Sequence, residues 1–272
     1  MTQFIDDLLL PSEIQKHIKT KVIGQNIYHF NRLTSTNKIA KDILHENGDN
    51  IKSGTVLIAE EQTDGIGRLN RVWHSPKGGI WSTIIVKSNM SADQTFIIMM
   101  AVSLALTHVI RHDYGLPALI KWPNDIYIGD KKVAGITVEL STDDSVVKYC
   151  IIGIGIDVNI PIKQTLPHIS NIATSISDEL GHKINRSEFF AKFLNDFEQK
   201  YNQILQSEIK PLFMEWKCLS YTLRRHVDVQ TFNKWFTGYA IDIDETGALI
   251  VQCDDGSLEK VISGDCTLTF KP

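Results

Sequence analysis

Five segments that are rich in β-branched residues or alternate in polarity constrain the fold of this chain more than any other feature. They are TVLIA (55–59), IWSTIIV (80–86), ALIKW (118–122), KVAGITVEL (132–140) and VVKYCIIGIGI (146–156). Such runs predict strands. Apolar residues at helical spacing predict helices over residues 33–48, 96–110 and 187–205, and a short capped helix over 11–20. This mixture indicates a large α/β or α+β domain in which helices cover a sheet.

The pattern changes after about Leu219, where short strand-like segments follow one another with turns between them. They are HVDVQTF (226–232), FTGYAIDID (236–244), ALIVQCD (248–254), LEKVISG (258–264) and CTLTF (266–270). Their spacing predicts a small all-β barrel of about fifty residues. A chain of 272 residues also exceeds the usual size of one domain. We therefore expect two domains, over residues 1–219 and 220–272.

Composition argues against several classes of protein. The formal net charge of −4 is unlike that of a general nucleic-acid-binding protein. The apolar run from Phe96 to Ile110 is shorter than the roughly 20 residues that span a bilayer, so we expect a buried helix and no membrane insertion. The four cysteines are scattered without a CxxC pair, which predicts free thiols in the reducing cytoplasm and no metal cluster.

The segment EEQTDGIGRLNRVWHSPKGG (60–79) is polar and rich in glycine, and it lacks apolar periodicity. Its glycines allow the backbone to approach a ligand closely. Arg68 and Arg71 can bind phosphate or carboxylate oxygens, and Trp73 offers a flat face to a purine. A solvated surface loop has the same residue types, so the segment alone does not decide between the two interpretations.

Three further polar clusters have both a structural and a functional interpretation. TSTN (34–37) begins a helix, yet capping uses only one hydroxyl, and the others could hold a small neutral heterocycle. KWPND (121–125) is a strong turn former whose flanking Lys and Asp also suit ribose, phosphate or a metal. Lys132, just before a strand, either projects into a site or is exposed in a hairpin. The glycine-spaced GIGIDVN (153–159) could lie beside a ligand.

Taken in order, the motifs STN, EQTxGxGRLNRxW, KWPND, KKVAGITVE and GIGIDVN resemble those of the biotin protein ligases. The resemblance runs from about Leu10 through the ending VISGDCTLTF. It implies a mixed β-sheet flanked by helices, akin to the class II aminoacyl-tRNA synthetases, followed by an SH3-like barrel. Fewer than forty residues precede STN, too few for the winged helix-turn-helix of some relatives. We therefore expect a monofunctional enzyme that does not bind nucleic acid.

The resemblance also implies the reaction. The family uses ATP and Mg²⁺ to convert biotin to biotinoyl-5′-AMP. It then transfers the biotinoyl group to one lysine of the biotin carboxyl carrier protein domain of a biotin-dependent carboxylase. Relatives often pair as homodimers through sheet edges. A mixed anhydride is readily hydrolysed, so the loop over residues 60–79 is expected to close over the adenylate and exclude water.

Site residues follow from the same resemblance. Catalysis is expected from Lys132, which would bridge the biotin carboxylate and the α-phosphate, from Arg68, and from Asp125, which would position the metal or the incoming amine. The residues expected at biotin are Ser35, Thr36, Asn37, Gln62, Gly65, Ile66, Gly67, Arg68, Lys132 and Gly135. Those expected at ATP are Arg68, Arg71, Trp73, Lys121, Asn124, Lys132, Gly155, Asp157 and Asn159. The sequence predicts no set of metal ligands.

Two residues depart from the family pattern. Ile66 stands where many members have an arginine, and Asp157 replaces the usual asparagine of GIGINVN. Two other functions compete. A lipoate–protein ligase shares the fold and the acyl-adenylate chemistry, but KWPND and the C-terminal barrel argue against it. A catalytically silent biotin sensor would not need Lys132, Arg68 and Arg71.

Overall fold

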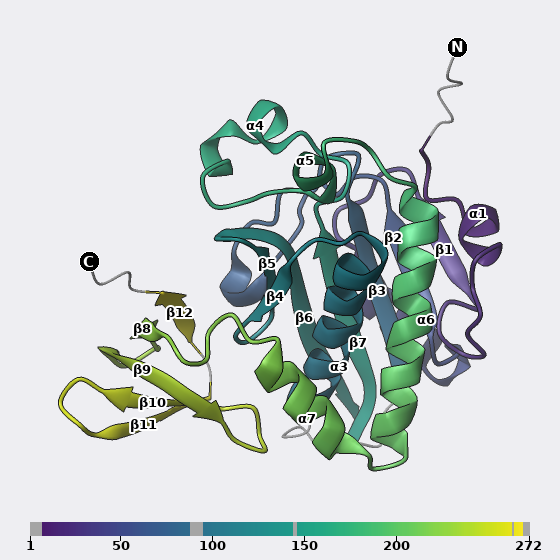
Figure 1. Cartoon of the computed structure of the whole chain (residues 1–272). Helices are drawn as coiled ribbons and strands as arrows, with labels where there is room; N and C mark the ends of the chain where they lie inside the picture. The colour runs from purple at the N-terminus through teal and green to yellow at the C-terminus, as the bar shows by residue number, and fades with distance from the viewer. Residues whose placement is uncertain (1–6, 88–94, 144–145, 263, 269–272) are drawn as a thin grey trace.

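The structure, a computed structural model, describes residues 7–87, 95–143, 146–262 and 264–268. The strands of its larger sheet are β1 (Ile27–Phe30), β2 (Thr55–Ala59), β3 (Ile80–Lys87), β4 (Ala118–Lys121), β5 (Asp125–Ile128), β6 (Lys131–Asp143) and β7 (Val146–Ile156). They lie in the order β1-β2-β3-β7-β6-β5-β4 (Figure 1). Only β1 and β2 are parallel, and the other neighbours are antiparallel. The predicted mixed sheet is confirmed.

The five predicted strands are all present, and β1 and β5 are two further strands that we did not predict. We interpreted KWPND as a turn at the end of a strand, and that turn is the three-residue link of a hairpin, residues 122–124. Lys121 at the end of β4 pairs with Asp125 at the start of β5. The strong turn formers Pro123 and Asn124 concealed the short apolar run DIYI that follows them.

Helices cover both faces of this sheet. They are α1 (Pro11–Gln15), α2 (Thr36–Asn47), α3 (Thr95–His108), α4 (Ile162–Thr165), α5 (Ile176–Leu180), α6 (Arg186–Leu205) and α7 (Ile209–Cys218). Figure 1 shows α3 and α6 against one face. On the other face, Ala40 and Leu44 of α2 pack with Leu57, Ile85 and Ile151. Because strand side chains alternate between faces, the next residues along these strands join the core beneath α3 and α6.

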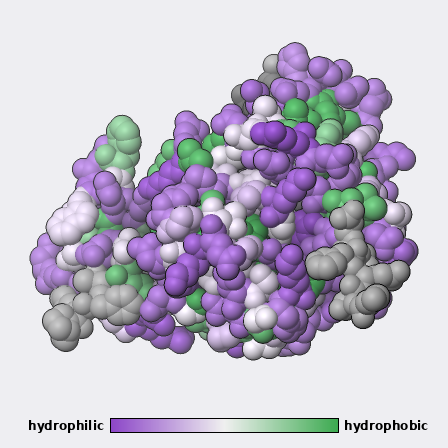
Figure 2. All heavy atoms as spheres, turned by 90° about the horizontal axis from the view of Figure 1, so that it is seen from above, coloured by the Kyte–Doolittle hydropathy of each residue, from purple (hydrophilic) through white to green (hydrophobic). Residues whose placement is uncertain are grey.

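Helix α3 continues as one π-helical turn over Val109–Asp113, which makes a 19-residue segment apolar enough to cross a membrane by length and composition. Core helices of globular proteins pass the same test, and 67% of its apolar window is buried. The expectation of a buried helix is confirmed. The molecular surface seen from above is mostly hydrophilic, with small separate hydrophobic patches (Figure 2).

The C-terminal strands form one antiparallel sheet in the order β11-β10-β9-β8-β12. They are β8 (His226–Gln230), β9 (Trp235–Ile243), β10 (Leu249–Cys253), β11 (Leu258–Val261) and β12 (Asp265–Leu268). These are the five strands that the sequence predicted, except that residue 263 of the fourth segment and residues 269–270 of the last lie outside the described residues. Among the described residues β11 and β12 are edge strands, so the barrel is not closed.

The two sheets share one apolar core, which includes buried side chains from α3, β8, β9 and β10. Trp122 of the larger domain donates its indole N–H to the carbonyl oxygen of Gly247, at 2.9 Å, in the turn between β9 and β10. Phe96 at the start of α3 packs under the same turn. The C-terminal sheet is therefore fixed against the end of the larger domain that carries KWPND.

Candidate active site

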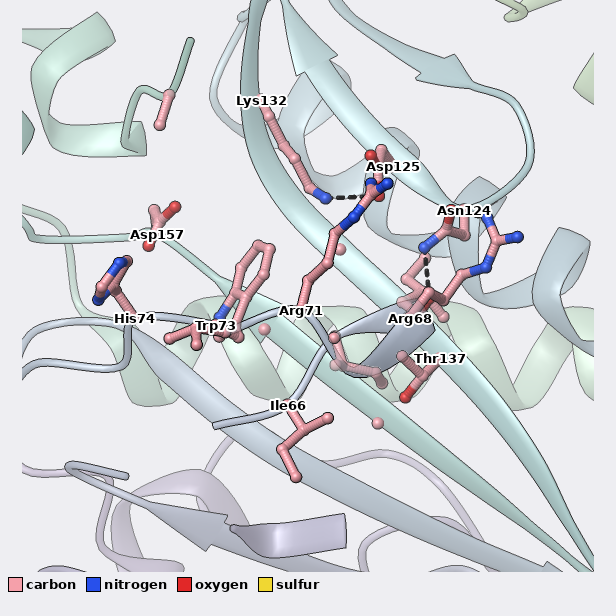
Figure 3. A pocket seen from close by; sticks show the side chains of 18 of the residues that line it. Ile66, Arg68, Arg71, Trp73, His74, Asn124, Asp125, Lys132, Thr137 and Asp157 are labelled. Carbon is pink, nitrogen blue, oxygen red and sulfur yellow. Dashed lines mark hydrogen bonds and ion pairs between the residues drawn. The ribbon is translucent and has the colours of Figure 1, made fainter. Parts of the chain in front are cut away.

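A cavity of about 350 Å³ lies over β6 and β7, on the same face of the sheet as α2. The loop over residues 60–79 and the segment over residues 166–173 form its walls. Figure 3 shows side chains from the loop and from the neighbouring strands converging on one space. Its size is that of a small-molecule site. Every residue that the sequence predicted for the site lines this cavity except Gly65, Lys121 and Asn159.

Lys132, at the start of β6, holds its ammonium group inside the cavity (Figure 3). Its Nζ atom lies 2.7 Å from Oδ1 of Asp125 and 4.9 Å from the ring centroid of Trp73. The backbone of Lys132 makes two 2.9 Å hydrogen bonds, to the carbonyl oxygen of Ile172 and from the N–H of Thr174. A cation held by a carboxylate, an aromatic face and a fixed backbone is preorganised for an anion.

The glycines of β6 and β7 make room for polar and aromatic side chains. A Cβ atom at Gly155 would lie 2.4 Å from the indole nitrogen of Trp73, and one at Gly153 would lie 2.4 Å from the amide nitrogen of Asn37. The glycine spacing of GIGIDVN thus follows from close approach of side chains to the sheet. The indole N–H of Trp73 is buried and has no hydrogen-bond partner among the described residues. The described residues therefore supply this donor with no acceptor.

The two loop arginines have different surroundings. Arg68 donates from Nη1 to the amide oxygen of Asn124 at 2.8 Å, and burial lowers the pKa of its guanidinium. Arg71 is exposed and forms an ion pair with Asp265 on β12, with Nη1 3.0 Å from Oδ1. The hydrogen bond to Asp265 raises the pKa of Arg71. The C-terminal sheet therefore contributes an acidic side chain to the rim of the cavity.

The tip of the loop is a tight, irregular hairpin. Gly67 donates to the carbonyl oxygen of Arg71, and Trp73 donates to that of Gly65, both at 2.8 Å. Leu69 and Asn70, which form the turn, have positive φ angles of 55° and 57°. This conformation brings both arginines and Trp73 to one side of the loop, facing the cavity (Figure 3).

A hydroxyl and amide cluster lies at another wall of the cavity. The side-chain oxygen of Gln62 accepts hydrogen bonds from the N–H and hydroxyl of Thr36, at 2.8 and 3.1 Å. Asn37 donates to the hydroxyl of Thr137 at 3.1 Å. Ser35 occupies the N-cap position of α2, yet its side chain makes no capping hydrogen bond. The buried hydroxyl therefore lines the cavity without serving the helix.

Three predicted residues do not line the cavity. Gly65 lies under the loop, where a Cβ atom would come within 2.4 Å of the carbonyl oxygen of Trp73. Lys121 donates to the hydroxyl of Tyr127 at 3.1 Å. The amide of Asn159 donates to Asp7 at 2.7 Å and to the carbonyl oxygen of Ile184 at 2.8 Å. Both polar side chains are engaged by the protein itself.

Other lining residues were not predicted. They include Val72, His74, Ser82, Tyr127, Thr137, Leu166, Ile169, Ile172, Ala173 and Asp265. The apolar segment over residues 166–173 had no short-range signal, because its role depends on how the chain folds back over β6. Asp265 did have a signal in the sequence, since it lies in the VISGDCTLTF ending that carries part of the resemblance.

Asp157 is an acid in the wall of the cavity with only 5% of its surface exposed. Burial raises the pKa of Asp157 to about 8, although the positive charge of Lys132 acts in the opposite direction. At neutral pH its carboxyl group is therefore mostly protonated. A protonated carboxyl has both a donor group and an acceptor oxygen, as an asparagine amide does.

Comparison with known proteins finds relatives that match both domains of the chain. Residues 29–157 match the Biotin/lipoate A/B protein ligase family, and residues 222–268 match the Biotin protein ligase C terminal domain. The bifunctional ligase/repressor BirA of Bacillus subtilis (strain 168) is 33% identical over 261 residues, which cover 96% of this chain and 79% of that protein. The biotin--[acetyl-CoA-carboxylase] ligase of Paracoccus denitrificans is 27% identical over 72% of this chain and 83% of that protein.

Solved structures resemble the chain over most of its length. An Aquifex aeolicus biotin protein ligase in complex with biotin and ATP has a TM-score of 0.77 at 24% identity, covering 91% of this chain and 100% of that one. A mutant of the Aquifex enzyme in complex with biotin has a TM-score of 0.76 at 25% identity, covering 91% and 99%. By its identity to the Bacillus protein and the coverage of both domains, this chain belongs to the biotin protein ligase family.

Proposed function

We propose that the chain is an ATP-dependent biotin–[biotin carboxyl carrier protein] ligase. In the first step a biotin carboxylate oxygen attacks the α-phosphorus of ATP, the bond to the bridging oxygen breaks, and pyrophosphate leaves. In the second step the amine of a carrier lysine attacks the acyl carbon of biotinoyl-5′-AMP, which forms an amide and releases AMP and a proton. The observation that carries the proposal is the ammonium group of Lys132 in a cavity that two arginines also line.

Lys132 is the proposed electrostatic bridge of the first step. The biotin carboxylate and the α-phosphate repel each other, and the barrier falls only where a cation meets the developing charge. Before ligands bind, Asp125 neutralises this ammonium at 2.7 Å. Anionic ligand oxygens would take over that contact. The freed carboxylate of Asp125 would then be available to position the amine of the carrier lysine.

The two ends of the cavity suit different parts of the intermediate. We assign the ureido ring of biotin to the cluster of Ser35, Thr36, Asn37 and Gln62, whose hydroxyl and amide groups match its donors and acceptors. We assign the nucleotide to the space beside Trp73, Asn124, Gly155 and Asp157, with its phosphates toward Arg68 and Arg71. A lipoyl dithiolane ring has no such donors and acceptors, so the polar cluster favours biotin.

Mg²⁺ fits this cavity as an ion carried on the phosphates. Among the described residues no group of three or more His, Cys, Asp or Glu side chains could hold a metal. Mg²⁺ commonly keeps its waters and binds through one or two carboxylates and substrate phosphates, and Asp125 is the carboxylate beside the proposed reaction centre. When bound, the ion would neutralise the charge of the leaving pyrophosphate.

The proposed function also includes the location of the enzyme, its acceptor, its oligomeric state and its domain bounds. We propose a cytoplasmic enzyme, which agrees with four cysteines that form no disulfide bond among the described residues. The acceptor would be the carrier domain of a biotin-dependent carboxylase. A homodimer could form through the open edge of β1. We retain residues 1–219 and 220–272 as the two domains, with the qualification that they share one core.

Single-turnover mass spectrometry tests this function. The chain would be incubated with biotin, ATP and Mg²⁺, with and without a biotin carrier domain, and with lipoate in a parallel reaction. We expect enzyme-bound biotinoyl-AMP, followed by one biotin mass increment on the carrier. Adenylation of lipoate instead would assign the neighbouring activity. Binding of biotin without pyrophosphate release would indicate a sensor.

A further inference from the structure

The loop over residues 60–79 leaves the sheet at the end of β2 and returns at the start of β3. Both of these points contact one buried side chain, Arg186, at the first position of α6. Its Nη2 atom lies 2.9 Å from Oε2 of Glu60, where the loop begins. Its Nη1 atom donates to the carbonyl oxygen of Gly79, where the loop ends, at 2.7 Å. Only 3% of the surface of Glu60 and of Arg186 is exposed.

Asn159 contacts the neighbouring residue at the end of the loop, Gly78. Its backbone N–H donates to the carbonyl oxygen of Gly78 at 2.7 Å. Gly78 has a φ of +103°, and a Cβ atom there would lie 2.8 Å from the carbonyl oxygen of Asn159. The side chains of Asn159 and Arg186 both bind a carboxylate oxygen of Asp7, at 2.7 and 2.8 Å. Arg186 and Asn159 therefore both contact the base of the loop, and both also bind Asp7.

These contacts are not needed to pair the strands. The ladder between β2 and β3 already runs from Thr55 to Ala59, and Gln62 pairs with Ser75 beyond it. The contacts with Arg186 and Asn159 fall between these two points, at the residues that set the angle at which the loop leaves the sheet. The loop tip beyond Ser75 and Gln62 carries the side chains that face Lys132. A small change of angle at the base becomes a larger displacement at the tip.

We propose that Arg186 and Asn159 are positioning residues that fix the base of the loop so that its tip covers the acyl-adenylate. Neither side chain lines the cavity, so both act through the loop and not on the ligand. The proposal rests on the proposed ligase function, and it adds which residues outside the site control retention of the intermediate. It also explains why the amide of Asn159, in the GIGIDVN motif, faces away from the cavity.

The principal variant is Arg186→Lys. A lysine keeps a positive charge opposite Glu60 but lacks the planar fork that reaches Glu60 and Gly79 together. Glu198→Gln is the matched control. Glu198 is also on α6, is 8% exposed, and accepts N–H donors from Lys21, Val22 and Ile23. Glu198 therefore makes charged hydrogen bonds like those of Arg186, but to residues 21–23 and not to the loop.

The experiment has two readouts. The first compares pyrophosphate release with the amount of biotinoyl-AMP found free in solution. We expect Arg186→Lys to release pyrophosphate in a single turnover as the native chain does, but to lose at least about tenfold more adenylate, as expected for weakened charged hydrogen bonds. The second is tryptic cleavage after Arg68 and Arg71 without ligands, which should be faster in Arg186→Lys. Glu198→Gln should match the native chain in both readouts.

Equal leakage and equal cleavage in Arg186→Lys and Glu198→Gln, at a similar loss of melting temperature, would overturn the proposal. If Arg186→Lys fails to fold, Asp7→Ala provides the same test. Asp7 is partly exposed and contacts Arg186 and Asn159 but not the loop. No adenylate from the native chain would refute the proposed function instead, while the cleavage rates would still decide the role of the loop base.

Discussion

Asp157 is an acidic side chain in the part of the cavity that we assign to an anionic nucleotide. As a carboxylate it would repel phosphates, yet it is buried beside β6 and its pKa is raised to about 8. Lys132 faces it from β6 and Asp178 from α5, and these two charges act in opposite directions on its pKa. The substitution of aspartate for the usual family asparagine therefore preserves a neutral side chain at physiological pH.

Replacing this acid by its amide should change the pH dependence of stability. The unfolded chain releases the proton near the ordinary pKa of 3.8, whereas the folded chain keeps it until about pH 8. Between these values the free energy of unfolding of the native chain falls as the pH rises, by up to about 1.4 kcal/mol per pH unit. We expect Asp157→Asn to become progressively more stable than the native chain from about pH 4 to about pH 8, and the difference to level off above that range. Urea unfolding at several pH values measures it, and a constant difference would contradict the raised pKa.

At the scale of elements, the glycines of β6 and β7 determine where Trp73 lies. Gly135 and Gly155 are directly paired across the two strands, and the indole ring lies against both. The sheet thus provides a flat floor beneath an aromatic ring. The position of Trp73 in turn sets the space for a nucleotide and supports the ammonium of Lys132.

A methyl group at Gly155 should displace the indole ring of Trp73 more than a methyl group at Gly135. A Cβ atom at Gly155 would lie 2.4 Å from the indole nitrogen, whereas one at Gly135 would lie 3.0 Å from the nearest ring atom and 3.2 Å from the flexible end of Lys132. We expect Gly155→Ala to raise the KM for ATP at least about tenfold, consistent with overpacking costs of 1–3 kcal/mol, and Gly135→Ala to raise it less. Near-ultraviolet circular dichroism should report the movement of Trp73. The reverse order of the two variants would exclude this explanation.

The sequence predicted those elements whose signal lies within one short segment of the chain, and it missed those that depend on contacts between distant residues. β2 and β7 were found with their observed bounds, because runs of β-branched residues identify buried strands. The loop and Lys132 were found through ordered motifs. The apolar wall over residues 166–173 and the base formed by Arg186 were not, because each depends on contacts between residues far apart in the chain. Asn159 was assigned to ATP, but its partners Asp7 and Ile184 come from outside its motif.

At the scale of the whole molecule, one turn joins the two sheets. Gly247 lies between β9 and β10, accepts the indole N–H of Trp122, and packs on Phe96. The exposed ion pair between Arg71 and Asp265 is a second connection, but such pairs contribute little stability. The packed turn should therefore contribute more to the stability of the junction than this ion pair does.

Two glycines of the C-terminal sheet test this expectation. Gly247 and Gly256 both have left-handed φ angles, of +82° and +87°. A Cβ atom at Gly247 would lie 2.0 Å from the ring of Phe96, whereas one at Gly256 would meet nothing within 4 Å. We expect Gly256→Ala to cost about 1 kcal/mol of unfolding free energy through backbone strain, and Gly247→Ala to cost at least about 2 kcal/mol more through the clash. Thermal unfolding measures both, and equal losses would show that the junction tolerates separation.

The core shared by the two sheets also limits how the two domains can be exchanged by recombination. A domain with its own core can be exchanged between relatives as a unit, since few contacts cross the boundary. Here buried side chains of β8, β9 and β10 pack in the same cluster as those of α3. A recombination event at residue 219 would join halves whose interior surfaces had not been selected together. We therefore expect recombination at this boundary to lower stability, because it would bring unmatched side chains together in the shared core.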